Sequence, residues 1–236
     1  MIELWELGGK NDCRYSTFAW RTRLALLHKG LAFEVHPVAV TDKGAIRFSG
    51  QDLVPIIRDG DRIVSDSWKI ACFLEQAYPE RPALFGSELG QNLTYFFNMW
   101  ADRELLPLLV PPLMLDVLGC VGEAEAAHHR TQMETIFKRK LEDLYAERAK
   151  TLEQFRKRLA PVRRILSDQT FIGGKTPAYA DHILFGVLQW ARVVSIEQVL
   201  DDGDVIGRWF ERVLDLYDGA GRREPARRER AMERSA

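Results

Sequence analysis

The sequence predicts an α/β domain built on a mixed four-stranded sheet, followed by an all-α domain. Two observations lead to this prediction. Residues 1–85 alternate between short apolar runs and amphipathic stretches, in the order strand, helix, strand and then strand, strand, helix. Beyond them, apolar residues recur at the three- and four-residue spacing of helices. We expect a first domain at residues 1–82 and an all-helical second domain at residues 90–218.

Turn residues and helix breakers set the elements of the first domain. Gly30 and Pro79 are expected to end its two helices. The turn Asp59-Gly60-Asp61 is a hairpin signal between two β-rich runs. The expected elements are a strand at 2–7, a helix at 20–29, a strand at 33–40, strands at 54–58 and 62–65, and a helix at 68–78. This is the order of a thioredoxin-like domain, a mixed four-stranded sheet with helices.

The second domain is predicted from apolar stripes at helical spacing, which begin at Leu93, Phe137, Leu152 and Ile183. Pro161 is expected to kink or end the third of these helices. The last 18 residues, 219–236, carry six Arg against three Glu and few large apolar side chains. We expect this Arg-rich tail to be solvated or disordered; the alternative is a basic contact for a partner or an anionic surface.

Composition excludes several classes of function. Lys and Arg number 33 and Asp and Glu 34, so the chain lacks the basic excess of a nucleic-acid-binding protein. Prolines interrupt the longest apolar run, 105–115, and the N-terminus lacks the pattern of a signal peptide, so we expect no membrane segment. Three widely spaced cysteines indicate a reducing, cytoplasmic location, and the five histidines show no metal-ligand spacing.

Three short motifs are candidates for a binding or catalytic site. Ser16 precedes a predicted helix, where a hydroxyl and the helix N-terminus can stabilise an anion. A Val54-Pro55 step opens the third strand, and Asp66-Ser67 precedes the next helix. In a thioredoxin-like domain all three converge at one end of the sheet. Each also has a purely structural explanation, as a helix cap or a strand-start proline.

These motifs, with others downstream, resemble the cytosolic glutathione transferases over about residues 2–217. The similarity is closest to the serine-type branch that holds the bacterial β-etherases of lignin breakdown and related fungal etherase-like transferases. The motifs shared with this branch are Trp20-Arg21-Thr22, Ala25-Leu26 with His28-Lys29-Gly30, Asp66-Ser67-Trp68, and Phe171-Ile172-Gly173-Gly174 with Pro177, Tyr179, Ala180 and Asp181. Their order and spacing carry the resemblance.

The resemblance implies that glutathione is the co-substrate. Ser16 would donate a hydrogen bond to its thiolate, and a cis Val54-Pro55 step would present the Val54 backbone to the tripeptide. Asp66 and Ser67 would hold its γ-glutamyl end. Thr17 stands where the family often has proline, so the sequence leaves open which of the two hydroxyls contacts the sulfur. The resemblance also implies a dimer.

The implied reaction is attack of the thiolate on a small hydrophobic or aromatic electrophile, by conjugation or aryl-ether cleavage. Tyr15, Phe18, Met114 and Leu115 are candidates for the acceptor pocket. One alternative is a non-catalytic protein that binds hydrophobic ligands and glutathione. Another is a thiol–disulfide exchanger acting through Cys13, which forms a C-x-x-S pattern with Ser16.

A further feature concerns a helix expected from Tyr179 to Val194. In the family, Ser or Thr stands three residues before Asp181 and completes a capping box. Here that position is Ala178. The carboxylate half of the box is present and the hydroxyl half is missing. We expect this to affect folding and not chemistry.

Overall fold

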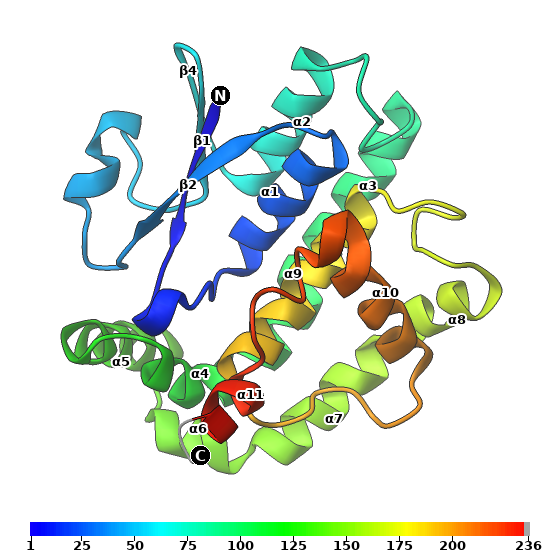
Figure 1. Ribbon diagram of the computed structural model, residues 1–236. Helices are drawn as coiled ribbons and strands as arrows, with labels where there is room; N and C mark the ends of the chain where they lie inside the picture. Colours follow the sequence, from blue (N-terminus) through cyan, green and yellow to red (C-terminus); the bar gives the residue numbers. More distant parts are fainter. Residues whose placement is uncertain (234–236) are drawn as a thin grey trace.

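The computed structural model describes residues 1–233 of the 236. Its first part is a four-stranded sheet in the order β2-β1-β3-β4 (Figure 1). β1 runs parallel to β2 and antiparallel to β3, and β3 forms a hairpin with β4. The strands are β1 (Ile2–Leu7), β2 (Phe33–Val38), β3 (Ile56–Asp59) and β4 (Arg62–Ser65). The predicted mixed four-stranded sheet is confirmed.

Helices α1 (Thr17–His28) and α2 (Ser67–Ala77) lie side by side next to the sheet (Figure 1). The short helical segment Gly44–Ser49 joins β2 to β3 and contributes Ile46 to a small second core with Trp5 of β1. α1 begins three residues before the expected start at Trp20, because Ser16 caps it. β2 ends two residues before the expected end at Val40.

The rest of the described chain is helical, as the sequence predicts. α3 and α4 are joined by a π-helical turn, Ala101–Leu105. α7 and α8 meet at Leu159, and Pro161 lies in the first turn of α8. The helices are α3 (Glu88–Trp100), α4 (Leu106–Val117), α5 (Glu123–Phe137), α6 (Leu141–Ala146), α7 (Arg148–Arg158), α8 (Ala160–Asp168), α9 (Tyr179–Val194), α10 (Val205–Gly219) and α11 (Arg227–Glu233).

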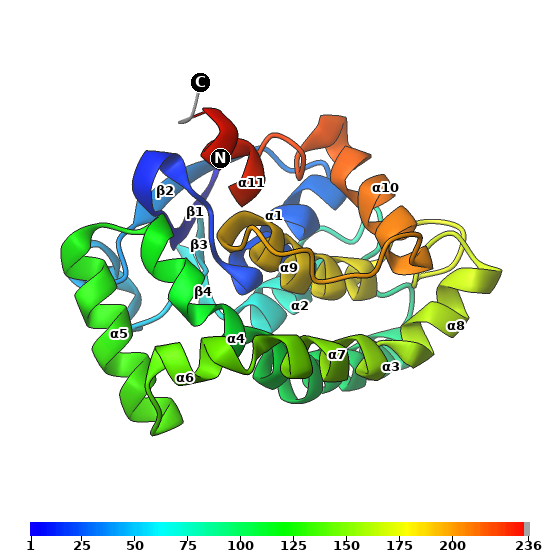
Figure 2. The same ribbon diagram turned by 90° about the horizontal axis from the view of Figure 1, so that it is seen from below.

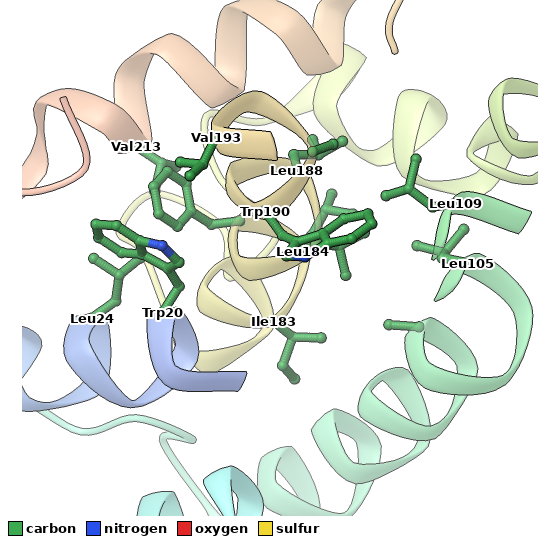
Figure 3. Close-up of a cluster of buried hydrophobic side chains, with 14 of the residues drawn as sticks. Trp20, Leu24, Leu105, Leu109, Ile183, Leu184, Leu188, Trp190, Val193 and Val213 are labelled. Atoms are coloured by element: carbon green, nitrogen blue, oxygen red, sulfur yellow. The ribbon is translucent and has the colours of Figure 1, made fainter. Parts of the chain in front are cut away.

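Helix α9 is the centre of the core. Almost every residue of α9 is buried, and its side chains meet those of α1, α4 and α10 (Figure 3). α9 and α1 lie very close together at Gly186, where a Cβ atom would lie only 2.4 Å from the backbone oxygen of Thr17. No side chain fits there, so a glycine lets the first turn of α1 rest directly on α9. The helical domain therefore fixes the position of the N-terminus of α1.

The Arg-rich segment after Gly219 corrects a prediction. We expected residues 219–236 to be disordered, but the described part, to Glu233, packs against α9 and forms α11. Ala226 is buried, and Gln189 of α9 donates a 2.8 Å hydrogen bond to the carbonyl of Gly221. Because these contacts are made largely by backbone groups, the polar composition of the segment gives no sign of them. Residues 234–236 lie outside the described part of the chain.

Among residues 1–233, no helix is both long enough and apolar enough to cross a membrane.

Candidate functional site

Ser16 is the N-cap residue of α1. Its backbone is extended, and its Oγ accepts a 3.2 Å hydrogen bond from the backbone N–H of Ala19. The residue is only 6% exposed. A hydroxyl that accepts through a lone pair still carries its own hydrogen to donate. Ser16 can therefore cap the helix and stabilise an anion at the same time, beside the positive end of the helix dipole.

The loop between β1 and Ser16 is held by contacts to the helices. The indole N–H of Trp20 donates to the carbonyl oxygen of Arg14 at 2.9 Å. The hydroxyl of Tyr15 lies 3.3 Å from Nε2 of His129 in α5. These contacts limit the freedom of the two residues that precede Ser16, so the position of its side chain is well defined.

Thr17 is the first residue of α1 and is buried to the same extent as Ser16. Its backbone carbonyl contacts α9 at Gly186. Unlike Ser16, Thr17 makes no side-chain hydrogen bond to the helix start among the described residues. The two hydroxyls are thus distinguished by their structural roles, with Ser16 at the cap and Thr17 inside the first turn.

The Val54–Pro55 peptide bond is cis, as the resemblance implies. Pro55 immediately precedes β3, and its carbonyl oxygen accepts a 3.2 Å hydrogen bond from the backbone N–H of Asp66. This bond joins the segment before β3 to the segment after β4. The Val54–Pro55 step and the Asp66-Ser67 pair are therefore next to each other.

Asp66 is the N-cap residue of α2. Its exposed carboxylate accepts hydrogen bonds from the backbone N–H groups of Trp68 and Lys69, both at 3.0 Å. Its φ of 79° is rare for a residue with a side chain and is often found at functional sites. Ser67 is buried, and its carbonyl accepts a 2.8 Å bond from the hydroxyl of Tyr179. The start of α2 is an anchored helix N-terminus, which suits a carboxylate ligand.

Sheet pairing brings the three motifs to one edge. Ser16 follows the loop that leaves the carboxyl end of β1. Trp5, near that end, pairs with Ile56 at the start of β3, and Ile56 pairs with Ser65 at the end of β4. The serine, the cis-proline step and the Asp66-Ser67 pair therefore share one end of the sheet, as the sequence predicts.

Cys13 does not have the surroundings of a nucleophilic thiol. It is 1% exposed. A hydrogen bond with Cys120 and burial both raise the pKa of the Cys13 thiol. Reactive cysteines need a lowered pKa and access to solvent, and Cys13 has neither. A role in thiol–disulfide exchange is not supported.

The expected acceptor-pocket residues are only partly suited to that role. Tyr15 and Met114 are buried in the core, and Leu115 is half-buried. Phe18, which is 38% exposed, is the one of the four with a substantial free surface. The expected lining by Tyr15 and Met114 is therefore wrong, because helix packing already covers both side chains.

Sequence reasoning missed a buried ion pair beside the site. Arg21, on the second turn of α1, has no exposed surface, and its guanidinium donates to Asp102 at 2.7 Å and to Asn98 at 3.0 Å. Its guanidinium also lies 4.9 Å from the centre of the Phe18 ring. This cluster ties α1 to α3. The only sequence signal was an arginine on the apolar side of a predicted helix.

Within the part of the chain that the structure covers, no three His, Cys, Asp or Glu side chains are grouped as metal ligands.

Comparison with known proteins identifies relatives of both halves. Residues 15–77 match the family model described as glutathione S-transferase, N-terminal domain, and residues 92–216 match the corresponding C-terminal domain model. A zeta-class glutathione S-transferase of Euphorbia esula is 37% identical over 114 residues, which are 46% of this chain and 48% of that relative. Glutathione S-transferase Z1 of Arabidopsis thaliana is 36% identical over 74 residues, 29% of this chain and 34% of that relative. The chain thus spans half or less of the length of these curated relatives.

Two solved structures share the fold over nearly the whole chain. A glutathione S-transferase of Ceriporiopsis subvermispora, solved in complex with glutathione, superposes with a TM-score of 0.81 at 24% identity and covers 92% of this chain and 96% of its own. A glutathione transferase of Phanerochaete chrysosporium has a TM-score of 0.74 at 22% identity and covers 94% of both chains. At this level of identity the likeness concerns the fold.

Proposed function

The chain belongs to the glutathione S-transferase family, and from this premise we propose that it activates the glutathione thiolate through Ser16 and transfers it to a hydrophobic electrophile. The observation that carries this proposal is the state of the Ser16 hydroxyl. One lone pair accepts from the N–H of Ala19, which leaves the O–H free to point at a ligand atom. A hydrogen bond donated to a thiolate favours the anion and lowers the pKa of the thiol.

The cis-proline edge and the start of α2 are proposed to bind the tripeptide. The Val54 backbone would pair with it like a short antiparallel strand. Its ammonium would meet the exposed carboxylate of Asp66, and its α-carboxylate would meet the hydroxyl of Ser67 at the N-terminus of α2. Glutathione carries both charged groups at its γ-glutamyl end, so these two adjacent residues match its chemistry.

The acceptor is proposed to be aromatic, in the manner of the serine-type β-etherase branch. The motifs Trp20-Arg21-Thr22 and Asp66-Ser67-Trp68 support this assignment. In aryl-ether cleavage the thiolate sulfur attacks the ether carbon, a C–S bond forms, the C–O bond breaks, and a phenolate leaves and takes up a proton. Conjugation follows the same displacement with a different leaving group.

A homodimer in the cytoplasm is also proposed. Leu89, Leu93 and Phe96 lie along one face of α3 and are 62–72% exposed. Large apolar side chains in such a row favour a protein partner, and a second copy of the chain is the proposed one. Phe96→Glu should then shift the protein from dimer to monomer in sedimentation experiments, and an unchanged molecular mass would contradict this interface.

Turnover measurements test the proposed function. Wild type, Ser16→Ala and Thr17→Ala are assayed with glutathione and two electrophiles, a chlorodinitrobenzene and a β-aryl ether. We expect turnover in the wild type, a large loss in Ser16→Ala and a small one in Thr17→Ala. Glutathione binding without turnover of either electrophile would instead identify a non-catalytic binder.

Asp66→Asn and Ser67→Ala test the binding half of the proposal by calorimetric titration with glutathione. Each should weaken binding by roughly 1.5–3 kcal/mol, the contribution of a hydrogen bond to a charged group. Lys69→Ala, an exposed neighbour on α2, serves as the control. Wild-type affinity in both variants would leave the two residues with helix capping alone.

A further inference from the structure

Glu224 is a buried carboxylate in the C-terminal segment that follows α10. It is only 8% exposed. Its Oε1 accepts a 3.2 Å hydrogen bond from the backbone N–H of Arg14, 210 residues earlier in the chain. The same oxygen accepts from the guanidinium of Arg230 in α11. A glutamate this far from the first domain therefore reaches the loop that carries Ser16.

The backbone of Arg14 is held on both sides of its Cα atom. Its N–H donates to Glu224, and its carbonyl oxygen accepts from the indole of Trp20 at 2.9 Å. Ser16 follows two residues later. The N–H belongs to the peptide unit between Cys13 and Arg14, and the carbonyl belongs to the unit between Arg14 and Tyr15. Since each unit is planar, anchoring one polar atom in each restricts the backbone dihedral angles of Arg14 and limits the directions in which the next residues can leave.

The segment that carries Glu224 is itself anchored. Arg192 of α9 donates to the carbonyl oxygen of Glu224 at 2.6 Å. Arg227 donates to the carbonyl oxygen of Gly119 at 3.2 Å. Gly221 fits so closely that a Cβ atom there would lie 2.6 Å from the ring of Phe185. Figure 2 shows α11 and this segment close to the loop that follows β1, where Arg14 contacts Glu224. Glu224 is thus a fixed point and not a side chain on a free tail.

Positively charged groups surround the Glu224 carboxylate. Burial raises the pKa of its carboxyl group, and the N–H of Arg14 together with Arg230 and Arg23 opposes that shift. These positive groups face the carboxylate from the N-terminal loop, α1 and α11. These groups favour the ionised carboxylate, which accepts the hydrogen bond from the backbone N–H of Arg14.

We propose that Glu224 is a positioning residue for the transferase reaction: through its hydrogen bond from the backbone N–H of Arg14, Glu224 orients the loop that carries Ser16. This inference rests on the proposed function of Ser16. Glu224 does not touch the reacting atoms, and it lies in another part of the chain from the residues proposed to bind the γ-glutamyl end. It should affect the activation of the sulfur and leave glutathione binding nearly unchanged.

Two substitutions separate this role from others. Glu224→Gln keeps an oxygen that accepts the Arg14 bond, and Glu224→Ala removes it. We expect Glu224→Ala to lower kcat at neutral pH roughly three- to tenfold, the factor that one lost hydrogen bond carries. It should also raise the midpoint of the pH–rate profile, with KM for glutathione within about twofold of wild type. Glu224→Gln should restore most of the rate. The matched control is Glu211→Ala, which removes an exposed carboxylate of α10 that pairs with Arg222, and it should have no effect.

Three results would overturn the proposal. These are an unchanged rate and midpoint in Glu224→Ala, a change in KM alone, or a Gln variant as impaired as the Ala variant. Amide hydrogen exchange at Arg14 gives a readout that does not depend on activity. Exchange should be at least tenfold faster in Glu224→Ala than in wild type, and equal exchange would also refute the anchor. If the wild type shows no turnover, or if Ser16→Ala has no effect on turnover, the proposed function is wrong. The hydrogen-exchange result would then still test whether Glu224 anchors the backbone of Arg14.

Discussion

The starts of α1 and α9 meet similar requirements in different ways. Both are buried, and both helices need their first N–H groups satisfied. At α9 the cap residue is Ala178, and the Asp181 carboxylate accepts four hydrogen bonds, from the N–H groups of Ile172 at 2.8 Å, Gly173 and Ala178 at 3.0 Å, and the Trp209 indole at 2.8 Å. At α1 the Ser16 hydroxyl accepts a single N–H.

The two helix starts differ in whether the capping side chain still has a hydrogen-bond donor free. The Asp181 carboxylate has only lone pairs, and four neighbours occupy them. Among the described residues, Ser16 accepts one bond and donates none through its hydroxyl. The first arrangement stabilises the fold and has nothing to offer a ligand. The second supports the fold weakly and keeps a donor for a bound anion. Changes at α9 should therefore alter stability, and changes at α1 should alter rate.

The largest expected effect is at Asp181. Asp181→Ala removes the acceptor of four N–H groups, the buried Trp209 indole and three partly buried backbone groups, and should lower the free energy of unfolding by about 3–5 kcal/mol. Urea denaturation measures this, with Asp168→Ala as the control because that aspartate is exposed at the end of α8. A loss below about 1 kcal/mol would mean that the carboxylate is not what holds the start of α9.

A smaller effect is expected from His182, the residue after Asp181. Burial and, less strongly, His28 hold the pKa of the His182 ring well below its ordinary value. The unfolded chain therefore binds a proton that the folded protein does not, so stability falls as the pH drops below about 6.5. His182→Gln should lose less stability than wild type on acidification, by on the order of 1 kcal/mol.

Thermal unfolding on both sides of this pH, with His128→Gln as a control on an exposed histidine of α5, measures the difference. If wild type and His182→Gln lose the same stability on acidification, groups other than His182 cause the loss of stability at low pH.

The smallest effect concerns the missing hydroxyl at Ala178. A serine there would supply the second half of a capping box, with a usual gain of about 0.5–2 kcal/mol. The backbone N–H of Asp181 already donates to the carbonyl of Ala178 at 2.9 Å, so the gain should fall near the lower end. The unfolding midpoint of Ala178→Ser should rise slightly while turnover stays constant. A lower midpoint would show that the hydroxyl cannot be accommodated at this turn.

The sequence was sufficient for elements whose signals are local. Alternating apolar residues and the Asp59-Gly60-Asp61 turn predicted β1 and β4 with their observed bounds, and the apolar stripe predicted α9 from Tyr179 to Val194. The convergence of Ser16, Pro55 and Asp66 at one end of the sheet followed from strand order. These features depend on spacing along the chain, which the sequence contains.

Features that depend on distant partners were not predictable. The segment after Gly219 is polar. It is held against α9 by its own backbone carbonyls, which accept hydrogen bonds from the side chains of Gln189 and Arg192. Arg21 is fully buried because Asp102 lies opposite it, 81 residues later in the chain. Composition and periodicity report the hydropathy of a residue and not the partner that it will meet.

A pH titration of bound glutathione tests the role of Ser16 most directly. The ultraviolet absorbance of the thiolate in the complex gives the pKa of the bound thiol for wild type, Ser16→Ala and Thr17→Ala. The free hydroxyl of Ser16 predicts a rise of roughly 1–2 pKa units in Ser16→Ala, equivalent to the roughly 1.5–3 kcal/mol of a hydrogen bond to an anion. Thr17→Ala should leave the pKa unchanged. An unchanged pKa in Ser16→Ala with a raised pKa in Thr17→Ala would contradict the account and assign the thiolate contact to Thr17.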